Sequence, residues 1–329
     1  MTTPRRYPRV VSSGSTRHGL VVVVAALAIS TTVAAADAPT GSADARTATC
    51  FGAAARDPEN PCLNRELSFV AIPAPYDAPL EPSAPCEPIE HASPRACAFG
   101  PRASKSVSSV ALIGDSHATA WRAAAAVLAH RMRWHGISIT RNSCPFTYAR
   151  SSAGRRCKGW AGSVRRWLQA HPEVKQAVVG ANSGAGVVAA DGHTMRTTKI
   201  DGYDAAWKSI PKSVRHIYVL RDVPHANNNT TECVAGAVHR RRKPALRCAR
   251  PRERALQVDE AAVAAQRTVS RRVQLIDLSD FMCDARSCFP VVGGALVIRD
   301  IGHLTRTFSR TLGPFLARAI SRVQGSSPR

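Results

Sequence analysis

Three residues have the types that an activated serine nucleophile requires. Ser116 follows Gly114 and Asp115 after a short apolar run, and Asp300 and His303 lie three residues apart near the C-terminal end. A serine hydroxyl is a weak nucleophile until a base accepts its proton, and the base needs an acidic partner that holds its tautomer and stabilises its cation. Ser116, His303 and Asp300 are therefore the candidate nucleophile, base and acid of a catalytic triad.

Neither the Gly-Asp-Ser motif nor the Asp300/His303 pair is specific evidence for a catalytic site on its own. A strand followed by Gly-Asp-Ser can be an ordinary turn, and an aspartate three residues before a histidine is often a helix N-cap beside a surface histidine. The two motifs are more specific together, because they lie in this order at opposite ends of one region with α/β patterning. The combination favours a serine esterase or acyltransferase.

The segment around Ser116 has the pattern of a strand followed by a helix. Residues 107–113 form an apolar run of strand length, and the Ala-rich segment 118–131 is typical of a helix. Further candidate strands lie at 137–140, 174–179, 214–220 and 273–278, and further candidate helices at 161–170, 252–269 and 305–323. This alternation predicts a three-layer α/β domain with a mainly parallel central sheet. Ligands of such sheets bind beyond the carboxyl ends of the strands, where Ser116 is expected.

Two blocks of the sequence resemble those of the SGNH hydrolases. Leu112–His117 resembles their first block, and Arg299–Thr305 resembles their last block. The closer resemblance is to the SGNH domain that is fused to, or works beside, the membrane acyltransferases that O-acylate bacterial surface polysaccharides. It extends to Tyr218–Pro224, to Asp277 and Leu278, and to the cysteines that follow each of these segments. The resemblance spans about residues 106–323 and implies a flavodoxin-like sheet and acyl-ester chemistry.

The resemblance also indicates donors for an oxyanion. The backbone N–H of Ser116 is one donor, and Asn182 lies where the family has its asparagine donor. Ser183 replaces the usual aspartate of that block, and an ordinary turn asparagine is the alternative interpretation of Asn182. The glycine of the family's second block is not placed by the sequence, and its candidates are Gly154, Gly159 and Gly162.

Ten cysteines lie in sequential couples with short spacings. An even count of this kind predicts five local disulfides, although the sequence leaves the connectivity open. The expected pairs are Cys50–Cys62, Cys86–Cys97, Cys144–Cys157, Cys233–Cys248 and Cys283–Cys288. A zinc site is the alternative, but no CxxC pair or tight Cys/His cluster has the required spacing. We therefore expect no metal and no other cofactor.

The N-terminal residues have the layout of a secretory signal. Four arginines precede an uncharged run, residues 20–36, that ends in Ala34, Ala35 and Ala36. This layout predicts a signal peptide, residues 1–36, with cleavage after Ala36 and a secreted or cell-envelope protein outside the cytoplasmic membrane. A retained N-terminal anchor is the alternative, although the continuously apolar part is shorter than the roughly 20 residues of a full span.

Two further segments lie outside the predicted SGNH domain, residues 106–323. Nine prolines interrupt residues 58–94, so residues 37–105 are predicted to be a Pro/Ala-rich linker and a disulfide-pinned lead-in. Residues 324–329 are predicted to be a disordered tail.

The chain is strongly basic, with a net charge of +22. Residues 1–36 hold four arginines and no acidic residue, so the remainder keeps +18. A basic surface attracts nucleic acid, anionic lipid or acidic polymers. Predicted export and an aromatic content of 5% argue against nucleic acid. An anionic wall polymer is the better-motivated partner, and a solvated Arg-rich surface without a specific partner is the alternative.

These observations predict an extracytoplasmic SGNH serine esterase or O-acyltransferase. Its substrates would be acyl esters, acetyl foremost, of a cell-surface glycan, and it would act through an acyl-serine intermediate. A transferase would receive its acyl group from a membrane acyltransferase or from a soluble ester. The alternative from another class is a catalytically inactive SGNH-fold binding module for an anionic cell-wall polymer, because a fold alone does not establish a function. A secreted lipase is disfavoured because no broad apolar lid is present.

Overall fold

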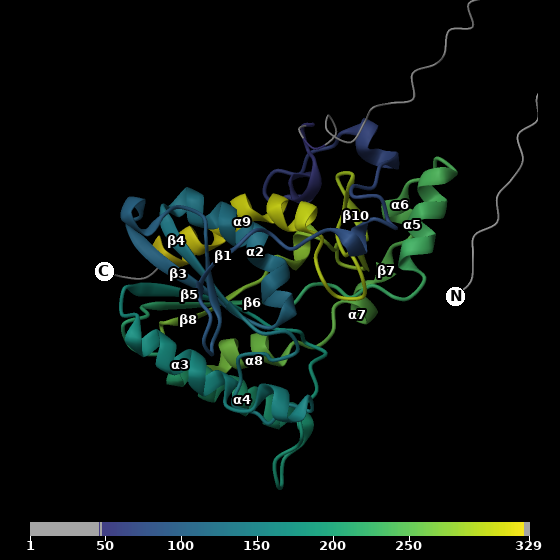
Figure 1. The fold of residues 1–329 in the computed structure, drawn as a ribbon. Coiled ribbons are helices and arrows are strands. Elements are labelled where there is room, and N and C mark those ends of the chain that lie inside the picture. Colours follow the sequence, from purple (N-terminus) through teal and green to yellow (C-terminus); the bar gives the residue numbers. More distant parts are fainter. Residues whose placement is uncertain (1–45, 47, 326–329) are drawn as a thin grey trace, which may run out of the picture. The chain divides into compact units, whose positions relative to one another are not determined.

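A mainly parallel sheet forms the centre of the computed structural model, which describes Arg46 and residues 48–325 (Figure 1). Its seven strands have the order β1-β2-β4-β3-β5-β6-β8, and the last five of these are parallel. The first parallel strand of the chain lies between the second and the third, which is the flavodoxin-like arrangement. The predicted three-layer α/β fold is therefore confirmed. The strands are β1 (Glu87–Glu90), β2 (Ala96–Phe99), β3 (Ser108–Gly114), β4 (Trp134–Thr140), β5 (Val174–Gly180), β6 (His216–Leu220) and β8 (Val273–Ile276).

Helices cover both faces of this sheet (Figure 1). Val110 and Leu112 of β3 are buried against the helices of one face, while Ala111 and Ile113 are buried against those of the other. A strand that is buried on both sides needs apolar residues at successive positions, which explains the continuous apolar run before Ser116. One face carries α2 (Ser116–Met132) and α9 (Arg306–Gly325), and the other carries α3 (Trp160–Ala170), α4 (Met195–Ser209) and α8 (Glu260–Arg267).

The end of β3 is shaped by Gly114. This residue has a φ of 146°, and a Cβ at its position would lie 1.9 Å from the carbonyl oxygen of Gly180. Only glycine allows β3 and β5 to stay this close where both strands end. Because the chain leaves β3 toward β4 and then returns across it to β5, this edge is also the topological switch point at which such sheets bind ligands.

The predicted helix over residues 252–269 is wrong, because the structure has two helices there. These are α7 (Arg252–Ala255) and α8, and they are separated by an extended Asp259 that caps α8 through Ala261 N and Ala262 N, at 2.9 and 3.1 Å. The sequence patterns also gave no prediction of α4 and of several short elements. The latter are α5 (Thr230–His239), α6 (Pro244–Arg247), β7 (Arg250–Pro251), β9 (Ser287–Cys288), β10 (Val291–Val292), β11 (Ala295–Leu296), η5 (Gly154–Cys157) and η6 (Ser279–Phe281).

Residues 48–105 pack against the α/β core. The hairpin of β1 and β2 joins the sheet beside β4 in antiparallel orientation, and Arg318 of α9 donates to the buried carboxylate of Asp57 at 2.8 Å. The domain boundary at residue 106 stays a prediction, while the structure places two strands of the same sheet before it. This segment also contains η1 (Gly52–Arg56), η2 (Arg65–Phe69), η3 (Ala78–Leu80) and η4 (Ala103–Lys105).

The two ends of the chain are described only in part. The predicted signal peptide, residues 1–36, lies outside the described residues, as do residues 326–329 of the predicted tail. Gln324 is part of α9, and its Nε2 donates to the hydroxyl of Tyr218 at 2.8 Å. No helix among the described residues is long and apolar enough to cross a membrane.

All ten cysteines lie in the described part of the chain, and all are disulfide-bonded there. The pairs are Cys50–Cys62, Cys86–Cys97, Cys144–Cys157, Cys233–Cys248 and Cys283–Cys288. Each disulfide therefore joins two consecutive cysteines of the sequence.

Candidate active site

The turn after β3 positions Ser116 as the first residue of α2. Asp115 is the N-cap of this helix, and its two carboxylate oxygens accept from His117 N and Asn182 N, at 2.9 Å each. Burial raises the pKa of Asp115. Both oxygens are therefore occupied by backbone donors, and Asp115 joins the nucleophile turn to the loop after β5.

The loop before α9 brings His303 to Ser116 from the far end of the sequence. His303 Nε2 lies 2.8 Å from Ser116 Oγ, and His303 Nδ1 lies 2.8 Å from Asp300 Oδ2. The backbone N–H groups of Gly302 and His303 also donate to Asp300 Oδ1, at 2.9 and 2.8 Å. The structure thus brings together all three predicted members of the triad.

Asp300 is held in its charged form by these donors. Burial would raise the pKa of this carboxyl, but the hydrogen bonds from the His303 ring and from two backbone amides outweigh it and hold the pKa well below its usual range. A carboxylate next to Nδ1 keeps the proton of the neutral imidazole on that nitrogen, so Nε2 is free to accept. This geometry allows His303 to take the proton of Ser116 Oγ.

Asn182 lies at the carboxyl end of β5, beside the strand that carries Ser116. Its Oδ1 accepts from the backbone N–H of Gly184 at 2.8 Å, which fixes the orientation of the amide. Its Nδ2 has no hydrogen-bond partner among the described residues, so this donor is available. The backbone N–H of Ser116 lies at the first position of α2, where amides have no intrahelical acceptor. The roles of Ser116 N and Asn182 as oxyanion donors stay predictions.

The loop after β4 begins beside the serine turn. Arg141 N donates to Gly114 O at 3.0 Å, and the hydroxyls of Thr119 and Thr140 lie 3.0 Å apart. The three glycine candidates for the second block lie further along the chain, between this loop and the first turn of α3. Gly154 is in η5, Gly159 precedes α3 and Gly162 is within α3.

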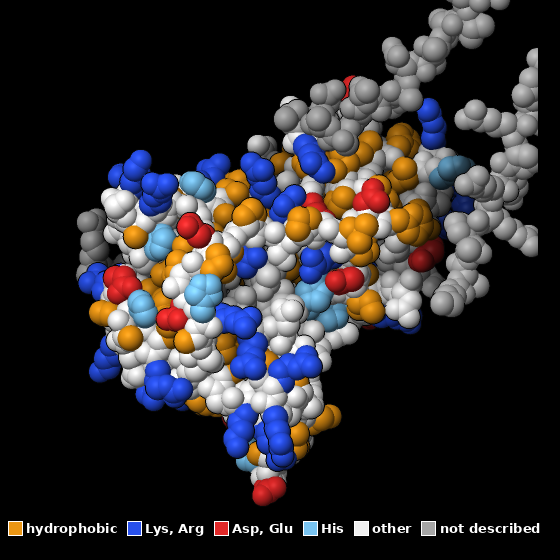
Figure 2. Space-filling view, in the orientation of Figure 1, with side chains coloured by type: hydrophobic (Ala, Val, Ile, Leu, Met, Phe, Trp, Pro, Cys, Tyr) orange, Lys and Arg blue, Asp and Glu red, His pale blue; other side chains and the backbone are white. Residues whose placement is uncertain are grey.

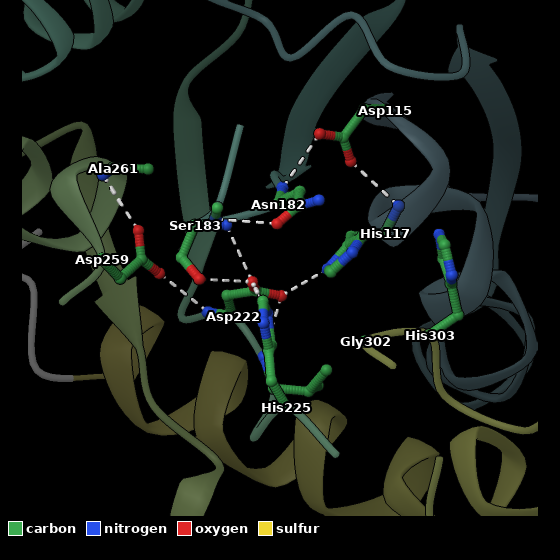
Figure 3. A network of polar contacts seen from close by, with 12 residues as sticks. Asp115, His117, Asn182, Ser183, Asp222, His225, Asp259, Ala261, Gly302 and His303 are labelled. Carbon is green, nitrogen blue, oxygen red and sulfur yellow. Dashed lines mark hydrogen bonds and ion pairs between the residues drawn. The ribbon is translucent and has the colours of Figure 1, made fainter. Parts of the chain in front are cut away.

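A buried polar network that was not predicted from the sequence lies on one side of His303 (Figure 3). Its centre is Asp222, directly after β6, which lies 2.6 Å from His117 Nδ1 and 3.1 Å from His225 Nε2. Ser183 donates to the same carboxylate through N and Oγ, at 2.8 Å each. Asp222 N in turn donates to Asp259 at 2.8 Å. The signal that could have identified Asp222 is its position after a buried strand at the ligand-binding edge of the sheet.

His117 and Asp222 form a buried ion pair. Burial alone would lower the pKa of His117, but the charge of Asp222 and its hydrogen bond raise it above the usual value. Burial would likewise raise the pKa of Asp222, but His117 and the other donors lower it well below the usual range. Each group therefore favours the charged form of the other.

This ion pair contacts the candidate base. Figure 3 shows His117 between Asp222 and His303, and the ring centroids of His117 and His303 lie 4.7 Å apart. A Cβ at Gly302 would lie 3.0 Å from Cε1 of His117, so the glycine lets the catalytic loop approach the ring. His117 therefore lies between the Asp222 carboxylate and the ring of His303.

The same cluster contains the residues that could hold a metal ion. Ligand atoms of His117, Asp222 and His225 lie within 4.8 Å of one another. The Asp222 carboxylate already accepts hydrogen bonds from both imidazoles, from Ser183 and from Val223 N. The hydrogen-bonding capacity of the Asp222 carboxylate is thus met by these donors.

The flavodoxin-like sheet, with a serine directly after its first parallel strand, is the architecture of the SGNH hydrolase class. A family model described as "SGNH domain (fused to AT3 domains)" matches residues 85–318, and the chain belongs to this family. The protein is therefore an enzyme that acts on ester bonds, as a serine hydrolase or acyltransferase. The match begins at residue 85 and so includes the β1–β2 hairpin.

Two solved structures are similar to the chain. The periplasmic domain of the lipopolysaccharide acetyltransferase of Salmonella ser. Paratyphi A is 15% identical, with a TM-score of 0.48 over 68% of this chain and 89% of that chain. A thermostable carboxylesterase cloned from a metagenomic library is 12% identical, with a TM-score of 0.35 over 80% of this chain and 96% of that chain. No curated protein sequence matches the chain.

Proposed function

We propose that the protein hydrolyses or transfers an acyl group, acetyl foremost, on a cell-surface polysaccharide outside the cytoplasmic membrane. The observation that carries this proposal is the 2.8 Å contact between Ser116 Oγ and His303 Nε2, with Asp300 2.8 Å from Nδ1. Membership of a family whose domains are fused to acyltransferase domains supports an O-acyl substrate and a membrane acyltransferase as partner. Five disulfides support an oxidising compartment.

In the proposed reaction, Ser116 Oγ bonds to the ester carbonyl carbon as its proton passes to His303 Nε2. The carbon–oxygen bond to the leaving alcohol then breaks, and His303 returns the proton to that oxygen, which leaves an acyl-serine. Water or a sugar hydroxyl next attacks the acyl carbon and gives its proton to His303. The bond between the acyl carbon and Ser116 Oγ then breaks, and the proton on His303 restores the Ser116 hydroxyl. Water as the second nucleophile gives an esterase, and a sugar hydroxyl gives an acyltransferase.

The test is covalent labelling of the purified protein, without residues 1–36, by a fluorophosphonate. This reagent phosphonylates only a serine that a base has activated, so we expect one adduct, located at Ser116 by peptide mass spectrometry. Ser116→Ala should abolish the adduct and His303→Ala should slow its formation. Equal labelling of wild type and Ser116→Ala would refute the proposal, and a folded wild-type protein that resists labelling would favour the binding-module alternative.

A further inference from the structure

A cavity of about 690 Å³ lies among the loops at the carboxyl ends of β4 and β5 and does not include Ser116 among its lining residues. Its walls come from the loop after β4 and from the loop after β5, with Tyr148, Trp160 and Val188 as its largest apolar residues. Volume and apolar lining are both typical of ligand sites. Tyr148 is 45% exposed and Val188 38% exposed, so both side chains present apolar surface to solvent.

The charge of the cavity is entirely positive. Arg150, Arg155 and Lys158 line it, and none of its lining residues is acidic. The side chains of these three residues are exposed and have no hydrogen-bond or ion-pair partner among the described residues. Figure 2 shows Lys and Arg side chains gathered around the N-terminal end of α4 and the loop before it. The uncompensated cations make this cavity complementary to an anion.

The two loops are fixed to each other before any ligand binds. Ser152 N donates to Gly186 O at 3.0 Å, and Val188 N donates to Arg150 O at 2.8 Å. The Cys144–Cys157 disulfide closes the loop after β4 across the same region. A wall that is already ordered loses little conformational entropy when it binds.

The sheet order relates the loops that line this cavity to the strand that carries the nucleophile. β3 lies between β4 and β5, so the two loops that line the cavity leave the sheet on either side of Ser116. Asn182, which is hydrogen-bonded to Asp115 of the nucleophile turn, is six residues from Val188, which lines the cavity. Six residues span at most about 20 Å, which limits the gap that an oligosaccharide would bridge between Ser116 and the cavity.

We infer that this cavity is a subsite for an anionic segment of the polysaccharide. Exposed aromatic surface from Tyr148 would contact sugar rings, and Arg150, Arg155 and Lys158 would bind carboxylate or phosphate groups. The inference rests on the proposed function, because it identifies the class of glycan that the esterase or transferase site receives. Two kinds of polymer carry such anionic groups: a polyuronate carries carboxylates, and a phosphodiester-linked wall polymer carries phosphates.

Binding to the Ser116→Ala protein, measured by titration calorimetry, tests the inference without depending on catalysis. The probes are polygalacturonate, a poly(glycerol phosphate) teichoic acid and neutral dextran. Replacing Arg150, Arg155 and Lys158 together by Gln should weaken binding of at least one anionic polymer by about tenfold or more, since three exposed charge pairs are lost. The polymer that binds identifies the source of the anion, and dextran should bind far more weakly.

The matched control removes three charges from another exposed basic run, Arg240, Arg241 and Arg242, again with Gln. This control should bind like the parent protein. Equal losses in both triple variants, no loss in the cavity variant, or dextran binding as tight as that of the anionic polymers would each overturn the inference. In the protein with Ser116 intact, the cavity variant should hydrolyse p-nitrophenyl acetate at the wild-type rate, because this small ester does not reach the cavity. Failure of that hydrolysis in the wild type would refute the proposed function and leave the binding result standing.

Discussion

His303 makes the two hydrogen bonds on which the proposed chemistry depends. Its partner Asp300 has a side chain that is 41% exposed, so solvent screens the attraction between the two groups. The main contribution of Asp300 is then to keep the proton on Nδ1 and the lone pair of Nε2 toward Ser116. Two backbone amides hold Asp300 for this purpose.

This division of roles predicts strongly non-additive substitutions. Ser116→Ala and His303→Ala should each lower kcat for p-nitrophenyl acetate by about 10³- to 10⁶-fold, and the double variant should lose little more, because the two residues act as a unit. Asp300→Asn should lower kcat less than either, since the imidazole remains. Steady-state kinetics on folded variants test this, and wild-type turnover by Ser116→Ala would contradict it.

Asn182 allows its two possible roles to be separated. Its Oδ1 accepts from Gly184 N, while Nδ2 is the candidate oxyanion donor. Asn182→Asp keeps an acceptor for Gly184 N and removes the donor. It should therefore lower kcat by about 10²- to 10³-fold if Asn182 stabilises the oxyanion, with little change in melting temperature. Unchanged kcat in both Asn182→Asp and Asn182→Ala would identify Asn182 as a turn residue only.

At the scale of elements, secondary structure could be predicted from the sequence where one local pattern determines it. The parallel strands are short apolar runs because helices bury both of their faces, and Gly-Asp-Ser marks the turn after β3. The helix α4 lacks such a pattern, because Asp201 and Gly202 lie in its middle. Its stability comes from distant partners: Tyr203 and Trp207 are buried against the sheet, and Gly202 O accepts from Tyr148 N at 3.0 Å.

The buried network around Asp222 could not be predicted either, because it too depends on contacts between residues that are far apart in the sequence. Nothing in the sequence around His117 indicates that its partner is Asp222, which is 105 positions away. Only the order of the sheet brings the ends of β3 and β6 close enough for this contact. The triad could be predicted because its residue types and their order are themselves informative, whereas the network depends on tertiary placement.

The N-cap of α8 gives a prediction at this scale. Burial raises the pKa of Asp259 from 3.8 to about 6, so the folded state holds this proton more tightly than the unfolded chain. The contribution of Asp259 to stability is then fully present below pH 3.8 and falls as pH rises through about 6. Asp259→Ala should lower the free energy of unfolding by about 1–2 kcal/mol through loss of the cap, and by more at pH 4 than at pH 7.

Urea denaturation at both pH values measures this difference. The matched control is Asp191→Ala, at an exposed position in the loop before α4, which should change the free energy of unfolding little at either pH. A deficit of Asp259→Ala that grows from pH 4 to pH 7 would show that the sign of the linkage is opposite.

At the scale of the whole molecule, the five disulfides allow both the predicted export and the stability of the fold to be tested. Every pair closes a short loop, with sequence separations between 5 and 15 residues. A protein oxidised outside the cytoplasm should therefore contain no thiol that reacts with iodoacetamide after unfolding. Mass spectrometry of secreted material tests this, and a reduced Cys144 or Cys233 in that material would contradict the predicted location.

Two of these disulfides provide a matched pair of variants. Cys86–Cys97 and Cys144–Cys157 have similar separations, 11 and 13 residues, so removing either should lower the free energy of unfolding by a similar amount, about 3 kcal/mol. Their positions differ, because the first joins β2 to the segment before β1 at the sheet edge and the second closes the cavity loop. The Cys144→Ser/Cys157→Ser protein should therefore bind anionic polysaccharide more weakly, while Cys86→Ser/Cys97→Ser should bind it normally. Calorimetric titration and thermal unfolding of both variants provide the measurement, and equal binding by the two would show that the cavity does not depend on the ordered loop.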